Sequence, residues 1–593
     1  MFFCMLVPYL SLEAQTKPEP RGSSGQASFD YFTVRDSIEM ARFERYGEPI
    51  FSPDGKYFAV VTSRGIIDRD EIESTLRIFK LEEVKRFLRN EDVTGHIVPR
   101  IVARMAAVPK VDYVNSYEPI ISNVKWSDGS RSLLFLRQNS DKERQLCRAD
   151  FGSGSFRALT PQGQDVSQFD VVGGTIVYRA SRSSQSPEVG ERINADARDI
   201  SGAPLISVLF GKSAQRYPPY SELWVYRNGQ NLCIRDPSTG RPVHLSNSPV
   251  VYPGLNPLSV SPDGRFVVAL VPVNSIPKAW ESYTPSRDSP KLDAKDPNGT
   301  ADSNWTRPTE YTLVDLNGGR MFPLLGSPHG WALGYGGKNL AIWSTSGKRL
   351  LVTNTYLPLD NVNGSERLKR LRPCSAAVVI LASNTSSCVT FESESSAALF
   401  GASFGETADE VVLRFGKDSA DERYSYEKGV WQRISATRAQ LPPQASNDAV
   451  AGMDASESLS VEIKEDLNTP AALWATDQRA GRSKMIWNPN PQLQKKTLGQ
   501  TSVFHWKDKT GHEWTGGLVK PPDYVLDKRY PLVIQTHGFF ASEFMSDGQY
   551  TTAFAARPLA AAGMVVLQVP DRSEHIGTGE RCRPRHETGT VFV

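Results

Sequence analysis

Apolar and polar residues alternate with a period of two along most of the chain, from about residue 49 to residue 495. This period places successive side chains on opposite faces of a β-strand. The clearest segments are IFSPDGKYFAVVT (50–62), VKWSDGSRSLLFL (124–136) and LSVSPDGRFVVAL (258–270). Each predicts a β-hairpin, because two apolar runs flank Ser-Asp-Gly or Ser-Pro-Asp-Gly, where Asp caps the turn and Gly takes the positive φ.

The hairpin pattern recurs along the chain. Weaker copies are FDVVGGTIVYRA, AIWSTSGKRLLVTN, FGETADEVVLRFG and DASESLSVEIKED, so the sequence predicts seven inner hairpins. Segments such as SELWVYRNGQNLCIRD and TEYTLVDLNGGRMFPL predict outer hairpins between them. A repeat of four strands is typical of a β-propeller blade, which favours a propeller of about seven blades with insertions at 181–220 and 275–310. Two separate β-sandwiches are the alternative.

The pattern changes after NPNPQL. In YPLVIQTHGFF (530–540), the run of Leu532, Val533 and Ile534 is apolar on both faces, as in a buried parallel strand. The Ala-rich segment TTAFAARPLAAAGM predicts a helix that ends at Gly563, and VVLQVPD predicts the next buried strand. Strand, helix and parallel strand form a βαβ unit. The fold is therefore expected to be mainly β, with an α/β segment near its end.

Length and composition narrow the function classes. A chain of 593 residues is too long for one hydrophobic core and predicts at least two domains. The formal charge of +2, with both signs interspersed, favours neither nucleic acid nor an acidic membrane surface as a partner. No apolar run reaches the length of roughly 18–20 residues that spans a bilayer. Neither a CxxC motif nor a His/Cys cluster is present, so we predict no metal and no cofactor.

Two further features bear on the cellular compartment. The start, MFFCMLVPYLSLEAQ, has an apolar stretch of export-signal length without a positively charged beginning, and a misassigned start is the alternative. Cys374 and Cys388 bracket a predicted strand, turn and strand, which allows a hairpin disulfide. Two ordinary thiols are the other interpretation.

The segments GGLVKPPDY, KRYPLVIQTHG and AAAGMVVLQV, placed after a propeller, resemble the prolyl oligopeptidase family of serine peptidases. NPNPQL, YPLVIQTHGF and TTAFAARPLAAAG are most similar to its branch that opens the isopeptide ring of lasso peptides. The resemblance extends from about residue 30 to 575.

This resemblance implies a domain order, a partner and a location. It implies a signal remnant and linker (1–28), a lead-in segment (29–48), a propeller (49–495) and an incomplete α/β-hydrolase domain (496–593). A peptide, and in this branch a lasso peptide, is the implied partner. The location is periplasmic or secreted, with the cytoplasm as the alternative.

The family's chemistry needs a Ser on a sharp strand-to-helix turn, then an acid and a His, all downstream of these strands. After VVLQVPDRSEHIGTG the sequence ERCRPRHETGTVFV has no apolar period, and we assign no nucleophile, acid or base. The oxyanion-hole candidates are the backbone groups of Gly538, Phe539 and Phe540. A Tyr that assists in many relatives is replaced here, because the nearby aromatic residues are Phe539, Phe540 and Phe544. We also expect the strand at 531–536 to have one edge without a partner.

Three other groups formally fit parts of this chemistry. Ser403 lies in GASFG, but a blade hairpin follows it instead of a long helix. Asp571, Ser573 and His575 lie together in DRSEH, which we interpret as a loop, and His537 is interpreted as a positioning residue. The sequence therefore predicts the lineage of a serine-type peptidase or isopeptidase, inactive as written. A non-catalytic peptide-binding propeller and a truncated gene product are the alternatives.

Overall fold

The structure is a computed structural model that describes most of the chain. The described residues are 30–44, 48–89, 96–109, 119–127, 129–140, 142–150, 155–182, 220–246, 257–273, 275–286, 289, 291–295, 308–392, 399–416, 420–437, 459–509, 511–536, 539–541, 544–546 and 555–570. The contacts divide the chain into two compact units. The larger unit is Ile38–Asn490, and the smaller one combines Met1–Ser37 with Pro491–Val593.

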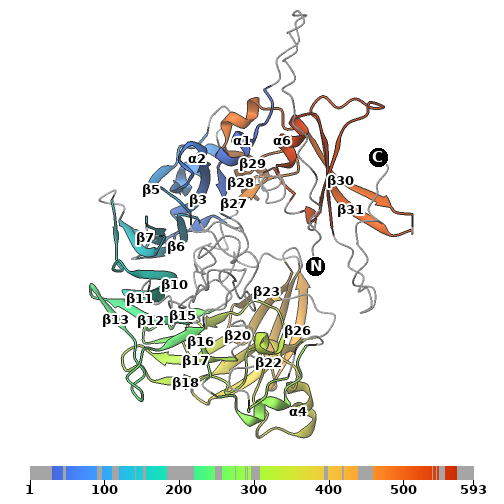
Figure 1. Cartoon of the computed structure of the whole chain (residues 1–593). Helices are drawn as coiled ribbons and strands as arrows, with labels where there is room; N and C mark the ends of the chain where they lie inside the picture. Colours follow the sequence, from blue (N-terminus) through green and yellow to red (C-terminus); the bar gives the residue numbers. More distant parts are fainter. Residues whose placement is uncertain are drawn as a thin grey trace, which may run out of the picture. The chain divides into compact units, whose positions relative to one another are not determined.

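The described strands of the larger unit form seven antiparallel sheets, which follow one another in chain order (Figure 1). Sheet 1 contains β1 (Arg42–Phe43), β2 (Ile50–Phe51), β3 (Tyr57–Ile66), β4 (Glu71–Lys80) and β5 (Arg100–Ala107). Sheet 2 contains β6 (Ile121–Ser127), β7 (Ser132–Gln138), β8 (Arg144–Asp150) and β9 (Phe156–Ala158). Sheet 3 contains β10 (Gln164–Val172), β11 (Thr175–Arg182), β12 (Tyr220–Arg227), β13 (Gln230–Cys233) and β14 (His244–Ser246).

The later sheets have the same meander order. Sheet 4 contains β15 (Leu258–Val260), β16 (Phe266–Pro272), β17 (Thr309–Asp315) and β18 (Met321–Pro323). Sheet 5 contains β19 (Ala341–Trp343), β20 (Arg349–Thr355), β21 (Cys374–Ile380) and β22 (Thr385–Phe391). Sheet 6 contains β23 (Leu399–Phe404), β24 (Glu410–Phe415), β25 (Asp421–Glu427) and β26 (Val430–Thr437), and sheet 7 contains β27 (Leu459–Lys464), β28 (Ala472–Asp477) and β29 (Arg482–Trp487). The prediction of a mainly β chain is confirmed.

The helices are short. The α-helices among the described residues are α1 (Val34–Glu39), α2 (Leu81–Arg89), α4 (Gly364–Arg370) and α6 (Ala556–Ala561). The 3₁₀ helices are η1 (Ile67–Arg69), η4 (Lys278–Ser282), η5 (Gly330–Leu333) and η6 (Pro491–Lys495). Among these described helices, none has the length and apolar character needed to cross a membrane.

The predicted turn chemistry recurs in three sheets, around Ser52, Ser261 and Ser344. In each turn the serine Oγ accepts a hydrogen bond from the backbone N–H five residues later, that of Tyr57 (2.9 Å), Phe266 (2.9 Å) or Arg349 (3.0 Å). The serine carbonyl accepts from the N–H of a glycine with positive φ three residues later, Gly55 (65°), Gly264 (70°) or Gly347 (68°). The Ser–Gly spacing therefore fixes the turn, including the copy that lacks Asp.

One predicted hairpin is wrong. The segment DASESLSVEIKED does not contain a hairpin in its described part, because Leu459–Lys464 is a single strand. It pairs with β28 across the connection 465–471, in the register Leu459↔Asp477 to Lys464↔Ala472. The connection that closes this hairpin thus begins only with the last two residues of the segment that was predicted to contain the whole hairpin.

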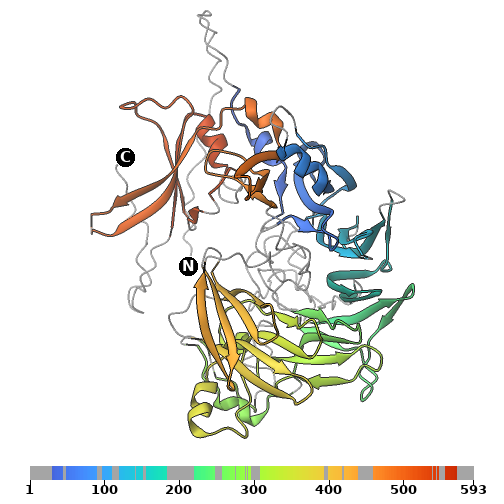
Figure 2. The ribbon, with the colours of Figure 1, turned by 180° about the vertical axis from the view of Figure 1, so that it is seen from behind.

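Apolar clusters join neighbouring sheets of the larger unit. Separate clusters connect sheets 1 and 2, 2 and 3, 3 and 4, 4 and 5, and 5 and 6. A further cluster joins the first sheet to the last, where Phe58 and Val60 of β3 pack with Leu473 and Ala475 of β28. Figures 1 and 2 show these two sheets side by side from both directions. Within the described ranges, no cluster joins sheets 6 and 7.

Two tryptophans at equivalent sequence positions link strands of neighbouring sheets. Trp126 Nε1 donates to the carbonyl of Ile50 at 2.8 Å, and Trp343 Nε1 donates to the carbonyl of Ser259 at 3.2 Å. Each tryptophan is followed directly by the serine of its own turn segment. The carbonyl groups belong to Ile50 and Ser259, which lie two residues before the turn serines Ser52 and Ser261. The same device therefore aligns sheets 1 and 2 and sheets 4 and 5.

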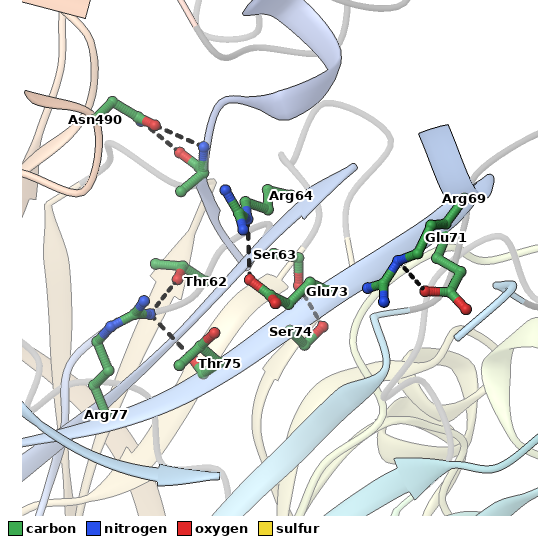
Figure 3. A network of polar contacts seen from close by, with 11 residues as sticks. Thr62, Ser63, Arg64, Arg69, Glu71, Glu73, Ser74, Thr75, Arg77 and Asn490 are labelled. Atoms are coloured by element: carbon green, nitrogen blue, oxygen red, sulfur yellow. Dashed lines mark hydrogen bonds and ion pairs between the residues drawn. The ribbon is translucent and has the colours of Figure 1, made fainter. Parts of the chain in front are cut away.

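Polar contacts join the start and the end of the larger unit. The Asn490 side chain accepts from Ala41 N at 2.7 Å and donates to Ala41 O at 2.6 Å, as Figure 3 shows beside sheet 1. In the same view the hydroxyls of Ser63 and Ser74 meet at 2.7 Å across β3 and β4. Ser74 Oγ also accepts from Ile120 N at 3.0 Å. The first sheet is thus tied both to the last residues of the unit and to the segment that enters sheet 2.

Cys374 and Cys388 form a disulfide between β21 and β22, with their Cα atoms 5.7 Å apart. The alternative of two ordinary thiols is therefore wrong. Ala377, and not Cys374, lies opposite Cys388 in the register, and irregularities occur between Cys374 and Ala377. A shifted register of this kind cannot be read from spacing alone.

The smaller unit contains a four-stranded sheet of order β30-β31-β33-β32 (Gln500–Lys507, Glu513–Lys520, Val565–Val569 and Leu532–Thr536). A short N-terminal segment belongs to this unit: Thr497 N donates to Asp30 O at 2.8 Å, and Phe32 N donates to Thr497 O at 3.3 Å. Lys496 Nζ lies 2.7 Å from Asp30 Oδ1 and 3.2 Å from Asp36 Oδ2, and its hydrogen bond to Asp30 raises the pKa of Lys496. These contacts hold residues 30–37 beside the start of the sheet.

Candidate functional site

The candidate site begins at the carboxyl end of β32. This strand pairs in parallel with β33, from Leu532↔Val565 to Thr536↔Val569, and β33 pairs antiparallel with β31. The parallel pair follows from the predicted βαβ unit, whose helix is α6. Open sheets of this type bind ligands beyond the carboxyl ends of their parallel strands. The segment after Thr536 is therefore in the expected place for chemistry.

Aromatic packing fixes part of the segment after β32. The rings of Phe539 and Phe544 meet edge to face, with centroids 5.5 Å apart, and Phe544 is fully buried. Both rings pack on Gly517 of β31: a Cβ there would lie 2.5 Å from Phe544 Cε1 and 2.7 Å from Phe539 Cε2. Neighbouring Gly516 approaches Gln568 O equally closely, at 2.5 Å from an added Cβ. The Gly-Gly pair thus provides the space that this loop fills.

A buried arginine supports the same loop from α6. The Arg557 side chain is inaccessible to solvent. Its guanidinium donates to Leu498 O at 3.1 Å and to Ser546 Oγ at 3.3 Å. Because a guanidinium presents several donors in a rigid plane, it can hold two segments in a fixed relation. Arg557 therefore links the loop at 544–546 to the chain that enters β30.

The structure describes two of the three predicted oxyanion-hole residues, and these two differ in their exposure to solvent. Gly538 lies outside the described residues, as does His537. Phe539 is half-buried in the aromatic contact, whereas Phe540 is 59% exposed. Their backbone N–H groups remain the predicted donors. Phe544 provides no side-chain donor, which agrees with the expectation that a Tyr is replaced in this loop.

Among the other sequence candidates, Ser403 is the one that the structure describes. Ser403 lies on β23 opposite Val412, is 6% exposed, and precedes the strand β24 instead of a helix. Its hydroxyl has no hydrogen-bond partner in the described part of the chain. Asp571, Ser573 and His575 lie outside the described residues. The interpretation of Ser403 as a residue within a blade-type hairpin agrees with its position.

Comparison with known proteins supports the predicted family. The chain is 24% identical over 170 residues to the lasso peptide isopeptidase AtxE2 of Asticcacaulis excentricus, a match that covers 27% of this chain and 24% of that protein. The resemblance to prolyl oligopeptidase-type peptidases is confirmed. No protein-family model matches the chain.

Solved structures of several peptidases resemble the chain. The acylaminoacyl peptidase of Pyrococcus horikoshii is 14% identical, with a TM-score of 0.47, over 91% of this chain and 66% of that one. The AtxE2 isopeptidase without ligand is 14% identical, with a TM-score of 0.37, over 92% of this chain and 67% of that one. A prolyl endopeptidase is 14% identical, with a TM-score of 0.42, over 91% of this chain and 63% of that one. The chain thus spans about two thirds of the length of these structures, and the isopeptidase match spans a quarter of that protein.

Sequence reasoning missed one group of side chains. The sequence pattern singled out no aromatic residue of the strand-rich region as a binding residue. Trp331, however, is 40% exposed, and it lies near Lys338, whose ammonium group stands over the ring of Phe400. The only sequence signal for this group is a Trp and a Lys in a connection between two predicted hairpins.

Proposed function

We propose that this chain provides a seven-bladed propeller and the first part of an α/β-hydrolase domain to a serine-type peptidase. Its substrates would be small, lasso-like peptides. The enzyme would hydrolyse a peptide bond or an isopeptide bond in them. The observation that carries the proposal is the parallel β32–β33 pair followed by a loop that packed aromatic rings hold in place. The match to a lasso peptide isopeptidase supports the same substrate class.

The arrangement of the seven sheets supports the propeller. Each sheet of a propeller must bury both faces against its two neighbours. Five clusters join successive sheets in chain order, and a sixth joins the first sheet to the last. Two separate sandwiches would not require a cluster between the first and the last sheet. The contacts therefore favour the propeller over the sandwiches.

We propose further that a polypeptide of residues 1–593 alone does not form an acyl-enzyme. A serine hydroxyl needs an adjacent base, and the base needs an orienting acid. The sequence assigns none of the three, and Ser403 lies within a hairpin. Oxyanion-hole donors without a nucleophile give little acceleration on their own.

A fluorophosphonate probe tests this part of the proposal. The 593-residue polypeptide is treated with the probe and, in parallel, with a lasso peptide whose ring opening is followed as the mass gain of one water. We expect no labelling above a heat-unfolded sample and no ring opening, while the AtxE2 isopeptidase, the positive control, shows both. Labelling of one serine, removed by Ser→Ala at that position, would contradict the inactivity.

A non-catalytic peptide-binding protein is the second candidate function. The exposed indole of Trp331 beside a half-buried Lys338 favours it, because neither group is needed for hydrolysis. Binding of a peptide to the 593-residue polypeptide without any change in peptide mass would distinguish this function from hydrolysis.

We also propose that the protein is periplasmic or secreted. The disulfide between Cys374 and Cys388 supports this location, because disulfides persist in oxidising compartments. Alkylation of the protein purified without reductant, followed by mass spectrometry, should leave Cys374 and Cys388 unmodified. Modification of both residues in protein taken directly from cells would favour the cytoplasm.

A further inference from the structure

Lys338 lies where two neighbouring sheets meet. It lies three residues before the first residue of β19 in sheet 5, and its backbone N–H donates to Leu399 O, at the start of β23 in sheet 6, at 3.3 Å. Its Nζ lies 4.0 Å from the ring centroid of Phe400. An ammonium over the face of an aromatic ring at this distance is attracted by the negative face of the ring. The Lys338 side chain therefore packs on Phe400 of sheet 6 and does not extend freely into solvent.

An exposed indole lies next to this lysine. Trp331 belongs to η5, and its Nε1 donates to Gly337 O at 3.1 Å, which places the indole beside the residue that precedes Lys338. Trp331 is 40% exposed although it is fixed by this bond. We call Trp331, Lys338 and Phe400 the aromatic–lysine surface.

The backbone under this surface is held rigidly. Thr353 Oγ1 donates to Lys338 O at 2.5 Å and accepts from Leu340 N at 2.8 Å. The side chain of the intervening Asn339 is buried and its Oδ1 lies 2.6 Å from His329 Nε2. Because these bonds order the backbone without a ligand, binding at this surface would need little further ordering.

The ammonium group of Lys338 is not neutralised within the described residues. No described carboxylate forms an ion pair with it, whereas Lys125, another poorly exposed lysine of the same unit, contacts Asp170 at 3.0 Å. Burial lowers the pKa of Lys338, and the charge of Glu48 acts in the opposite direction without forming an ion pair. A partly buried cation gains most from an anion that replaces its lost hydration. An anion would therefore be a favourable ligand for the Lys338 ammonium group.

We infer that the aromatic–lysine surface binds a carboxylate of a peptide, with Lys338 as its counter-ion and Trp331 as the contact for the neighbouring side chain. This inference rests on the proposed function, because it assumes that the ligand is a peptide. The carboxylate is either the C-terminus or an Asp or Glu side chain. An exposed, fixed indole offers a large apolar face at low entropic cost, which suits the residue beside the carboxylate.

Three labelled peptides test the inference with the full 593-residue chain. The first is fluorescein-Gly-Ser-Gly-Ser-Ala-Phe with a free C-terminal carboxylate, and the second is its C-terminal amide. The third is the amide with Glu in place of the second Ser. Binding is measured by fluorescence anisotropy. The free acid should bind about tenfold more tightly than the amide, a difference of about 1.4 kcal/mol in binding free energy.

Two substitutions separate Lys338 from general charge. Lys338→Met keeps an apolar chain on Phe400 and should abolish the preference for the acid, while Lys338→Arg should retain it. Lys348→Met is the matched control, because Lys348 is exposed in the turn between β19 and β20 of the same sheet and should leave the preference unchanged. Near-UV circular dichroism confirms that each variant is folded.

The outcomes distinguish the inference from the proposed function. Loss of the preference in Lys338→Met alone supports the inference, and tight binding of the Glu peptide would identify a side-chain carboxylate as the anion. Equal binding of all three peptides to the unmodified chain, or an unchanged preference in Lys338→Met, would overturn the inference but leave peptide binding intact. Failure of the unmodified chain to bind any of the peptides would count against both peptide binding and the inference.

Discussion

An ion pair between Lys125 and Asp170 links the first strands of three successive sheets. Lys125 Nζ on β6 lies 3.0 Å from Asp170 Oδ1 on β10, and Asp170 Oδ2 accepts from Val260 N on β15 at 2.7 Å. The two side chains are only 12% and 2% exposed. Removing the carboxylate therefore leaves a poorly hydrated ammonium and a buried N–H without this acceptor.

This geometry sets the size of the expected effect. Breaking a buried pair by removing one partner costs about 3–5 kcal/mol, so we expect Asp170→Ala to lower the free energy of unfolding by that amount. Asp170→Asn should cost less, because its carbonyl oxygen can still accept from Val260. Adding Lys125→Met to Asp170→Ala should restore part of the loss, with a coupling on the order of 1–3 kcal/mol.

Urea unfolding of the full chain, followed by near-UV circular dichroism, measures these differences. The matched control is Asp150→Ala, which removes the exposed pair of Arg148 and Asp150 at 2.8 Å, with side chains 31% and 42% exposed. This control should cost less than about 1 kcal/mol. If Asp170→Ala and Asp150→Ala lower the stability equally, the assignment of Asp170 as a buried link between sheets is refuted.

Two further predictions concern a buried histidine and the glycine under the candidate loop. Burial lowers the pKa of His329 to about 4 from 6.5, so between these pH values the unfolded chain binds a proton that the folded chain does not. The free energy of unfolding should therefore fall as the pH falls through this window, by up to about 3 kcal/mol. Urea midpoints measured at pH 7 and pH 4.5 should differ less in His329→Gln, because this variant lacks the titrating ring. An unchanged slope would contradict the burial of a neutral ring. Gly517→Ala should lower the free energy of unfolding by about 1–3 kcal/mol and expose residues 539–546 to limited proteolysis, because its Cβ would meet Phe539 and Phe544. Gly364→Ala is the control and should have neither effect, because the space around Gly364 is open. Equal protease resistance of both variants would contradict the packing of the loop on β31.

The local turn chemistry was predictable from the sequence because its interactions lie within a few residues. The turns at Ser52 and Ser261 follow directly from Ser-Pro-Asp-Gly, where the hydroxyl, the carboxylate and the glycine act on the adjacent backbone. The order of β32, α6 and β33 was also predictable, because two apolar strands joined by an apolar helix have one favoured connection. The sequence could therefore locate the candidate site at the end of β32.

Features that depend on distant partners were not predictable in the same way. The strand at 459–464 was assigned to a hairpin of its own, but its partner β28 lies beyond the connection 465–471. The Cys374–Cys388 bond depends on an irregular register between β21 and β22. The packing of Phe539 and Phe544 on Gly517 joins the loop after β32 to a residue of β31, which is distant in sequence. In each case the deciding contact is made by folding and not by the local pattern.

Two poorly exposed lysines of the larger unit, Lys125 and Lys338, show that burial alone does not reveal the role of a charged side chain. Lys125 and Lys338 are both withdrawn from solvent and both stand near a phenylalanine ring, at 5.6 Å and 4.0 Å. The sequence pattern does not show which of the two has a carboxylate partner. Lys125 has a carboxylate from the neighbouring sheet, and so its charge is accounted for by the fold. Lys338 has no such partner among the described residues, and an exposed indole lies beside it, so its charge is explained better by a ligand than by stability. The two lysines thus differ in whether the fold supplies a carboxylate partner. We therefore expect Lys125→Met to change the free energy of unfolding and Lys338→Met to change the affinity for a peptide carboxylate.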